Sequence, residues 1–511
     1  MSRTRPSPGA PAEAGARFAD SDLAFASAVV LAVVLFRLCV AGLVDLVPDE
    51  GYYWLWAQAP SAGYYDHPPM VAWWIYAGTA LFGDTPLGVR AVPVLADLVL
   101  SAAVYATGRE LGLSRRVAAT AALWINATFL IAGAMLLATP DAPSVALWAL
   151  TVWALARLRR TGAETWWFAV GLFAGLGCVA KYTNLFLGPG IVLWIVLDPQ
   201  ARRWLRSPWP YLGGLVALAA FLPVIMWNAG HGWISFAKQF GRITDGHLTL
   251  RYLGEFVGGQ FALLNPLIAL FAGLAILRIR RRDLLGNRTS PAAFLALLSA
   301  PLVLYMMLHA FHDRVQGNWP APIYPAAALL AAVAAADPRN DVRWRRLARW
   351  VLPVGLGLQI VGLGYAAVAG PAGLPFRSPL DQVAGWGAMT DRLQELAERN
   401  GAGWIATADY GLTGELAFHS GAPDTVQEVV ERARYSFQTP DAGLAKEPAL
   451  LVLRRRDPDI AHFRACFASI QPLGTVSRSA GPRVVDDYRV YKVAGARPDL
   501  LTAGCDGETA N

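Results

Sequence analysis

The sequence predicts a polytopic α-helical membrane protein with about eleven transmembrane helices and a C-terminal extracytoplasmic α/β domain. Hydrophobic residues make up 55% of the 511 residues and charged residues only 16%, whereas soluble proteins carry charge on about a quarter of their residues. The mean hydropathy is +0.37. Apolar residues occur in blocks of roughly 17–25, the length that crosses a hydrocarbon core. After Pro371 the apolar runs shorten and polar residues return, which indicates a second, water-facing domain.

Apolar windows separated by polar residues give the positions of the helices. A retained first helix is expected, because no small-residue cleavage site follows a short apolar stretch near the N-terminus. The predicted spans are 25–47, 86–106, 117–135, 142–157, 165–180, 183–198, 210–226, 261–277, 291–309, 322–337 and 350–370.

The charges between the spans predict the orientation of the chain. Nineteen arginines lie in one set of loops, 107–116, 157–164, 199–209, 278–290 and 338–349. Only five Lys or Arg residues lie in the opposite set, 48–85, 136–141, 181–182, 227–260 and 310–321. The positive-inside rule therefore places the N-terminus in the cytoplasm and the C-terminal domain outside. The net charge of +7 reflects this topology, and because no recognition motif surrounds the cations, we expect no nucleic-acid partner.

The chain divides into three parts. Residues 1–24 are expected to form a disordered cytoplasmic tail, and residues 25–370 a transmembrane domain with long outer loops at 48–85 and 227–260. Residues 371–511 form the outer α/β domain. Its predicted strands are 404–407, 449–453 and 488–493, and its predicted helices are 381–399, which ends at Asn400-Gly401, and 411–419.

Four cysteines are too few and too scattered for a disulfide scaffold or a zinc cluster. Cys39 and Cys178 fall inside apolar segments. Cys466 and Cys505 lie near the C-terminus and could form a disulfide if their compartment is oxidising.

The first outer loop is the most informative stretch. It contains four carboxylates, Asp49, Glu50, Asp66 and Asp84, no cation, and many aromatic residues suited to the membrane interface. A carboxylate directly after a transmembrane helix is partly desolvated, which raises its proton affinity and suits it to act as a general base. The alternative is that Asp49-Glu50 only ends a helix in water while the aromatic residues anchor an interfacial loop.

Other ionisable residues collect at the same face of the membrane. Asp141 follows Thr139-Pro140 between two spans, Lys181 lies at the top of two others, and Arg90 lies near the outer end of the second span. Ionisable groups near a bilayer are costly, so their default interpretation is functional. Carboxylates opposite cations suit a hydroxyl nucleophile and a phosphate leaving group.

Each of these residues also has a structural interpretation. Lys181 could extend to the interface, and Asp141 could cap the next helix. Arg37, inside the first span, is expected to pair with a buried carboxylate or carbonyl. His67, His309 and His312 are candidate metal ligands, although no two of them have i, i+4 spacing and no cysteine accompanies them.

Five motifs, in this order and on one face, resemble the C-type glycosyltransferases. Within them, the resemblance is to the family that contains protein O-mannosyltransferases and the lipid A aminoarabinose transferase (glycosyltransferase family 39), and it covers about residues 25–370. The motifs are Asp49-Glu50 with Tyr52-Tyr53, Asp66-His67-Pro68-Pro69, Thr139-Pro140-Asp141, Ala180-Lys181-Tyr182, and Asn318-Trp319-Pro320 with Tyr324.

The resemblance implies roles for these positions. Asp49 would be the base that deprotonates the acceptor, and Glu50 its companion in binding or orientation. The residues implied in binding the lipid phosphate of the donor are Lys181, Tyr182, Arg90, Asp141 and Tyr324. The residues assigned to the acceptor or the covering loops are Tyr52, Tyr53, Asp66, His67, Arg314, Asn318 and Trp319.

The implied function is an inverting glycosyltransferase of the bacterial inner membrane. It would move a sugar from a polyprenyl-phosphate donor, such as undecaprenyl phosphate, to a hydroxyl or phosphate acceptor such as lipid A or another envelope glycan on the periplasmic side. Membrane lipid is a further partner. A lipid-linked donor is also expected independently, because nucleotide sugars stay in the cytoplasm. No cofactor is certain, and a divalent metal is an open alternative.

Other functions remain open at this point. The acceptor could be a protein, as in protein O-mannosyltransferases. A transporter or lipid flippase also has many spans with ionisable residues, but it should show repeated halves and broken helices at the midplane. A membrane scaffold that presents the outer domain would need no polar cluster.

Overall fold

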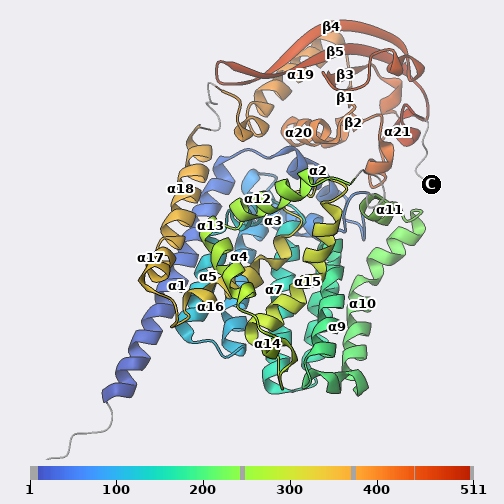
Figure 1. Cartoon of the computed structure of the whole chain (residues 1–511). Helices are drawn as coiled ribbons and strands as arrows, with labels where there is room; N and C mark the ends of the chain where they lie inside the picture. The colour runs from blue at the N-terminus through green and yellow to red at the C-terminus, as the bar shows by residue number, and fades with distance from the viewer. Residues whose placement is uncertain (1–9, 242–247, 370–375, 442, 507–511) are drawn as a thin grey trace, which may run out of the picture.

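The computed structural model describes residues 10–241, 248–369, 376–441 and 443–506. A helical body carries a smaller domain with a mixed β-sheet at one end (Figure 1). The helices of the body are α1 (Ala10–Leu43), α2 (Pro48–Gln58), α3 (Met70–Phe82), α4 (Pro86–Glu110), α5 (Arg115–Asn126), α6 (Phe129–Leu136), α7 (Asp141–Thr161), α8 (Trp166–Ala180), α9 (Leu187–Leu197), α10 (Trp209–Gly230), α11 (Ile234–Phe240), α12 (Arg251–Leu263), α13 (Pro266–Leu277), α14 (Arg281–Leu285), α15 (Pro291–His309), α16 (Tyr324–Ala335), α17 (Val342–Ala348) and α18 (Val351–Ala369).

Every predicted span falls on one helix or on two consecutive helices. Within the described residues, five helical segments are long and apolar enough to cross a membrane by length and composition. The consecutive helices α5 and α6 are bent by 67°, and α12 and α13 by 109°, so each pair is a broken span or a re-entrant loop. The five straight segments are Asp22–Leu43, Pro86–Glu110, Trp209–Gly230, Pro291–His309 and Val342–Val368, and the shorter apolar helices are Met70–Phe82, Trp166–Ala180, Tyr182–Leu197 and Ala321–Ala335.

The N-terminal segment differs in part from the expected disordered tail. Residues 1–9 of that tail lie outside the described residues, but α1 already begins at Ala10. Alanine is the strongest helix former and recurs through residues 10–19, which favours continuation of the helix toward the N-terminus.

The first outer loop, 48–85, is mostly helical. It contains α2 and the apolar helix α3. In α3, Trp73 and Tyr76 are 37% and 56% exposed, whereas the aromatic residues of α2 are buried: Tyr52, Trp54 and Trp56 are at most 4% exposed. They pack in one core with Trp386 and other residues of the C-terminal domain. Placing these side chains between two parts of the protein removes more apolar surface from water than an interfacial position would.

Arg37 is paired within the body, as predicted. Its guanidinium forms an ion pair with Asp97 of α4 and donates a hydrogen bond of 3.1 Å to Oε1 of Gln359 on α18. Arg37 and Asp97 have no exposed surface. A buried charge of this kind is tolerated because it is paired and hydrogen-bonded, so we assign Arg37 a structural role.

The C-terminal domain has a five-stranded sheet in the order β2-β1-β3-β5-β4. Strands β2, β1 and β3 are parallel, and β5 is antiparallel to both β3 and β4. Gly401, at φ 63°, ends α19 where the sequence predicted a helix stop. The elements are α19 (Trp386–Asn400), β1 (Trp404–Thr407), α20 (Tyr410–Ser420), β2 (Val426–Glu428), β3 (Ala449–Arg454), β4 (Phe467–Ala480), β5 (Arg483–Ala496) and α21 (Leu500–Ala503). A disulfide joins Cys466 to Cys505.

The C-terminal domain docks on the helical body through α20 and α2. A Cβ atom on Gly51 of α2 would lie 2.8 Å from the backbone of Gly414 of α20, so only glycine allows the two helices to approach this closely. Phe418 of α20 adds an edge-on ring contact to Trp54, with ring centroids 5.1 Å apart. This contact fixes the position of the first residues of α20 above the start of α2.

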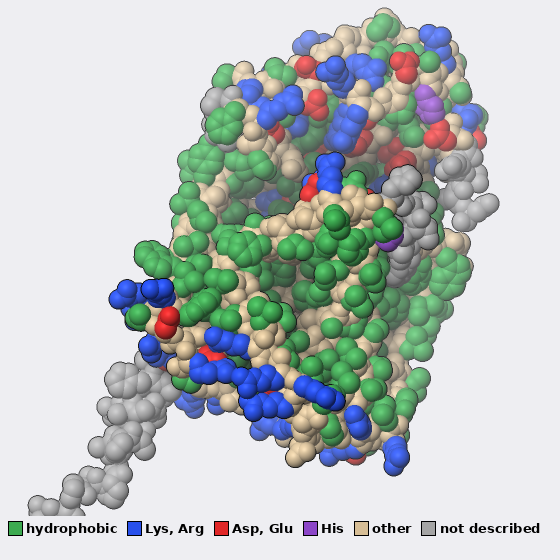
Figure 2. All heavy atoms as spheres, in the orientation of Figure 1, with side chains coloured by type: hydrophobic (Ala, Val, Ile, Leu, Met, Phe, Trp, Pro, Cys, Tyr) green, Lys and Arg blue, Asp and Glu red, His purple; other side chains and the backbone are tan. Residues whose placement is uncertain are grey.

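Lysine and arginine side chains gather at the end of the helical body that lies farthest from the sheet domain (Figure 2). Between this end and the sheet domain, the visible face of the body is mostly hydrophobic. A mostly hydrophobic band of the body therefore separates this cationic end from the sheet domain, which carries side chains of both charges.

Candidate active site

Asp49 is held in the first turn of α2 by its neighbours. Pro48 occupies the first helical position, which its fixed φ favours. Glu50 accepts a hydrogen bond from the Val47 backbone at 3.1 Å, and its other oxygen accepts one from the backbone of Ala138 at 2.8 Å. The start of α2 is thus fixed to the segment that leads to Asp141.

The Glu50 carboxylate is itself locked by Arg90. The guanidinium of Arg90 donates from Nε to Oε1 at 2.8 Å and from Nη2 to Oε2 at 2.5 Å. It also donates to the backbone carbonyls of Ala41, Val44 and Asp45 at the end of α1. Such two-pronged pairs between arginine and a carboxylate are among the strongest in proteins. This network holds the first turn of α2, and with it Asp49, in place. Glu50 and Arg90 themselves do not line the cavity described next.

A cavity of about 200 Å³ lies beside Asp49, between the helical body and the C-terminal domain. Its wall contains residues from the first loop, from the segment before α7, from the end of α8, from the loop after α15 and from the C-terminal domain. The lining residues are Asp49, Tyr52, Tyr53, Asp66, His67, Thr139, Pro140, Asp141, Lys181, Gln239, Gln316, Asn318, Trp319, Tyr410 and Arg434. Asp49 and Lys181 therefore share one cavity.

Lys181, Asp141 and Asn318 form a connected group on one wall. The Lys181 ammonium lies 2.7 Å from Oδ1 of Asp141, and the Asn318 amide donates to Oδ2 at 2.7 Å. Lys181 is 6% exposed and Asp141 3%. An ammonium has three donor hydrogens and only one is needed for Asp141, so Lys181 keeps donors for a ligand in the cavity that it lines.

Asp66 belongs to a second wall and is also paired. Its Oδ2 atom accepts hydrogen bonds from Nη1 of Arg434 at 2.7 Å and from the Tyr52 hydroxyl at 3.1 Å. Gln239 donates to its backbone carbonyl at 2.6 Å. Burial raises the pKa of the Asp66 carboxyl, and the Arg434 charge opposes this rise. Asp66 is therefore better suited to hold the loop and Arg434 in place than to accept a proton.

Asp49 is the cavity carboxylate that no cation contacts within the described residues. The Asp49 side chain is exposed and lines the cavity. Burial raises the pKa of Asp49, the hydrogen bond from the Tyr410 hydroxyl opposes the rise, and the charges of Glu50 and Asp66 add to it. A carboxylate with increased proton affinity is suited to general-base catalysis.

Five predicted site residues do not line this cavity. Glu50 and Arg90 are buried against each other. The Tyr182 hydroxyl lies 2.9 Å from the Ser235 hydroxyl, and Tyr324 donates to Gln260 at 2.8 Å. Arg314 is exposed and forms an ion pair with Glu255. These five side chains contact other protein groups. Any contribution that they make to the site would be to hold the cavity residues in position.

Four cavity residues were not predicted from the sequence: Tyr410 and Arg434 of the C-terminal domain, Gln239 of α11, and Gln316 of the loop after α15. The Arg434 guanidinium lies over the Tyr410 ring, 4.9 Å from its centroid, so the two residues support each other. No motif signals them. The only sequence indication is that Tyr410 follows directly after a strand end, where ligand-binding residues of α/β sheets often lie.

Among the described residues, no group of three or more His, Cys, Asp or Glu side chains is arranged to hold a metal ion. The cavity residues do not fit a divalent ion, because Asp66 and Asp141 are paired with Arg434 and Lys181.

Sequence comparison finds relatives of known activity. The model of the family described as dolichyl-phosphate-mannose-protein mannosyltransferase matches residues 66–227. The lipid A galacturonosyltransferase RgtD of Rhizobium johnstonii is 27% identical over 355 residues, which cover 67% of this chain and 69% of that protein. The undecaprenyl phosphate-α-4-amino-4-deoxy-L-arabinose arabinosyl transferase of Pseudomonas aeruginosa is 29% identical over 362 residues, covering 66% of this chain and 63% of that protein.

A solved structure shares the fold. The crystal structure of ArnT from Cupriavidus metallidurans bound to undecaprenyl phosphate superposes with a TM-score of 0.66 at 16% identity, covering 93% of this chain and 99% of that one. The superposition therefore includes the C-terminal domain as well as the helices. The resemblance predicted from the motifs is confirmed: the chain is similar in sequence to the dolichyl-phosphate-mannose-protein mannosyltransferase family and to lipid A glycosyltransferases, shares its fold with ArnT, and is a glycosyltransferase.

Proposed function

We propose that the protein is an inverting glycosyltransferase that moves a sugar from a polyprenyl-phosphate donor to a hydroxyl or phosphate oxygen of lipid A or another envelope glycan. The observation that carries this proposal is the shared cavity: Asp49 lies on one side of it and the Lys181–Asp141–Asn318 group on another. A proton acceptor and a phosphate-binding cation are the two groups that this transfer requires.

In the proposed reaction, an acceptor hydroxyl attacks the anomeric carbon of the donor. The new bond joins the acceptor oxygen to this carbon, and the bond between the carbon and the phosphate oxygen breaks. The hydroxyl proton passes to the Asp49 carboxylate, and the bonding electrons leave with the polyprenyl phosphate. Lys181 and the Asn318 amide stabilise the negative charge that develops on that phosphate. A phosphate acceptor attacks as an anion and needs no proton transfer.

Inversion follows from the number of carboxylates that are able to react. A retaining enzyme uses a second carboxylate as a nucleophile, about 5 Å from the first. Here the other carboxylates of the cavity wall, Asp66 and Asp141, are tied to Arg434 and Lys181. A single displacement at the anomeric carbon inverts its configuration.

The relatives support the donor and acceptor classes. Both sequence relatives are named for activities on lipid A or on undecaprenyl-phosphate-linked sugars. The structural relative was solved with undecaprenyl phosphate, the lipid product that such a transfer releases. We extend these classes to this chain without specifying the sugar.

We also propose that the helical body lies in the bacterial inner membrane with about eleven crossings, the N-terminus in the cytoplasm and the C-terminal domain in the periplasm. The arginine-rich end of the body, far from the sheet domain, supports this orientation (Figure 2). We assign residues 25–370 to the transmembrane glycosyltransferase domain and 371–511 to the periplasmic domain. The loops 48–85 and 227–260 would cover the cavity and exclude water, which would otherwise hydrolyse the donor.

Mass spectrometry of envelope material tests the proposed function. Lipid A, other envelope glycans and envelope proteins are analysed from cells that lack the gene and from the same cells complemented with the wild-type chain. We expect a pentose or hexose mass on lipid A or another glycan only in the complemented cells. The same mass on a protein would instead indicate a protein acceptor. Identical spectra in all fractions would contradict glycosyl transfer.

A further inference from the structure

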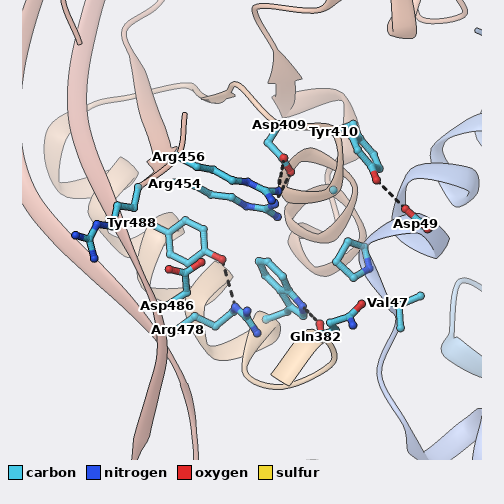
Figure 3. Close-up of a pocket in the computed structure, with 14 residues that line it drawn as sticks. Val47, Asp49, Gln382, Asp409, Tyr410, Arg454, Arg456, Arg478, Asp486 and Tyr488 are labelled. Carbon is cyan, nitrogen blue, oxygen red and sulfur yellow. Dashed lines mark hydrogen bonds and ion pairs between the residues drawn. The ribbon is translucent and has the colours of Figure 1, made fainter. Parts of the chain in front are cut away.

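A second, larger cavity lies on the other side of Asp49, within the C-terminal domain and at its junction with the first loop. Its volume is about 510 Å³. Asp49 and Tyr410 line both cavities, and the hydrogen bond between them forms part of the shared wall (Figure 3). A group bound in the second cavity can therefore reach the proposed base, which also lines the cavity of Lys181.

The sheet topology places this cavity where α/β proteins bind ligands. Strands β1 and β3 are parallel neighbours, and their carboxyl ends deliver Asp409-Tyr410 and Arg454-Arg455-Arg456 to the same edge. Ligands of open α/β sheets bind in the crevice outside the carboxyl ends of the strands. Both segments line the cavity.

The lining carries more positive than negative charge. Four arginines, Arg454, Arg455, Arg456 and Arg478, face three carboxylates, one of which is the base Asp49. In Figure 3, the Arg454 and Arg456 side chains both extend to Asp409, with contacts of 2.7 and 2.9 Å. Asp457, outside the lining, also interacts with both arginines, so Arg454 and Arg456 by themselves carry no excess charge.

Arg478 adds a charge that no carboxylate contacts within the described residues. It donates to the backbone carbonyls of Asp381 and Ala384 at 2.7 and 2.6 Å, and its guanidinium lies 4.1 Å from the centre of the Trp386 ring. Arg478 is only 6% exposed. Since carbonyls and an aromatic face do not neutralise a cation, Arg478 contributes to a fixed positive potential in the cavity.

We propose that this second cavity binds an anionic group, phosphate or carboxylate, on the headgroup of an acidic glycolipid acceptor, and that Arg455 and Arg456 hold that group while the reacting oxygen lies beside Asp49. This proposal rests on the proposed function, because it assigns the acceptor side of the same reaction. The donor phosphate is already provided for by Lys181 in the first cavity. Asp49 then lies between acceptor and donor, as a single displacement requires.

A binding experiment tests this assignment without turnover. The full-length chain is placed in nanodiscs of zwitterionic phosphatidylcholine. The probes are lipid A with both phosphates, the same lipid A with both phosphates removed, and undecaprenyl phosphate. The variant Arg455→Gln/Arg456→Gln removes two exposed guanidinium groups. The control Arg392→Gln/Arg464→Gln removes two exposed arginines of the same domain that do not line the cavity.

We expect the wild type and the control to bind phosphorylated lipid A about tenfold or more tightly than the dephosphorylated lipid, because hydrogen bonds to charged groups are involved. The cavity variant should lose this preference and keep its affinity for undecaprenyl phosphate. Melting curves confirm that the variant is folded.

Two results would overturn the assignment. One is a phosphate preference that persists in the folded cavity variant. The other is an equal loss of affinity for undecaprenyl phosphate, which would assign the arginines to the donor. Transfer is measured separately. Arginine-dependent binding without any transfer contradicts only the proposed function, whereas transfer that does not depend on the arginines contradicts only the acceptor site.

Discussion

The hydroxyl of Tyr410 donates a hydrogen bond of 2.9 Å to the carboxylate of Asp49, although the two residues are 361 positions apart. One belongs to the C-terminal domain and the other to the first loop. The candidate base therefore lies at the junction of the two parts, and its proton affinity depends on how they dock.

Replacement of Tyr410 by Phe should shift the acid limb of the pH–rate profile to higher pH. The Tyr410 hydrogen bond stabilises the ionised form of Asp49 and so lowers its pKa, against the rise that burial causes. Removing the hydroxyl lets the pKa of Asp49 rise further. A larger fraction of Asp49 is then protonated at a given pH and cannot act as the base. The profile of kcat for Tyr410→Phe is compared with that of Tyr491→Phe, a tyrosine of β5 away from the cavity. An unshifted acid limb in an active Tyr410→Phe enzyme would show that this hydrogen bond does not tune the base.

Replacement of Lys181 by Met should lower kcat by about 10²–10³-fold, the effect of losing one donor to developing negative charge. The donor KM should also rise, because in the proposed reaction Lys181 would contact the phosphate in both the bound donor and the transition state. Asp141→Asn should have a smaller effect of the same kind, since Asn retains an oxygen that can orient Lys181. Steady-state kinetics of Lys181→Met and Asp141→Asn, with Lys446→Met as the control, checks that the first variant loses more activity than the second. Equal kinetics for Lys181→Met and the control would remove Lys181 from the phosphate site.

Gly414→Ala should abolish transfer while leaving the C-terminal domain folded. A Cβ at this position would collide with the backbone of Tyr52, so α20 must move away from α2 and carry Tyr410 from Asp49. The matched change Gly387→Ala places a Cβ no nearer than 3.7 Å to a neighbouring atom. Activity and limited proteolysis of the two variants are compared. Full activity of Gly414→Ala would contradict the dependence of the site on this close docking.

A half-buried histidine, His419, should make the docking of the domain weaker at alkaline pH. His419 of α20 lies 3.3 Å from Asp45 at the end of α1 and 3.6 Å from the buried Glu415. Burial by itself would lower the pKa of His419, but the two carboxylates outweigh it and raise the pKa to about 9. Burial raises the pKa of Glu415 to about 8. Both groups hold protons more tightly in the folded state.

The stabilisation from His419 is therefore complete below its ordinary pKa of 6.5 and is lost as the pH rises through about 9. Melting temperatures of the wild type and His419→Gln, measured from pH 6 to pH 10, check this sign. We expect the wild type to be the more stable protein at pH 6 and the difference to disappear toward pH 10. A difference that grows with pH would contradict the assignment.

The part of the site that belongs to the helical body could be predicted from the sequence. Asp49, Asp141 and Lys181 each stand at the end of an apolar window on one face, so topology alone brings them to the same level of the molecule. The three residues share one cavity because three separate helices pack together. The apolar windows predict the order of these helices along the chain but not the distances between them.

The remainder depends on contacts that no local pattern specifies. Arg90 pairs with Glu50 across 40 positions, which removes both charges from the cavity. The aromatic residues of α2 have the composition of an interfacial anchor, but the C-terminal domain covers them. Tyr410 and Arg434 reach the cavity only because α20 docks on α2, a contact between segments with no shared motif. The short strand β2 and the strand β4 were not predicted, and β5 was predicted only over residues 488–493.

The most direct test of the account is a single-turnover measurement on Asp49→Asn. Asn keeps the size and the hydrogen-bond acceptor for Tyr410 but cannot accept a proton, and Asp84→Asn, in the same loop and outside the cavity, is the control. With an acceptor that reacts through a hydroxyl, we expect the transfer rate of Asp49→Asn to fall by about 10²–10⁴-fold, the usual contribution of a general base. Donor binding should be unchanged. A transfer rate equal to that of the Asp84→Asn control would contradict Asp49 as the base.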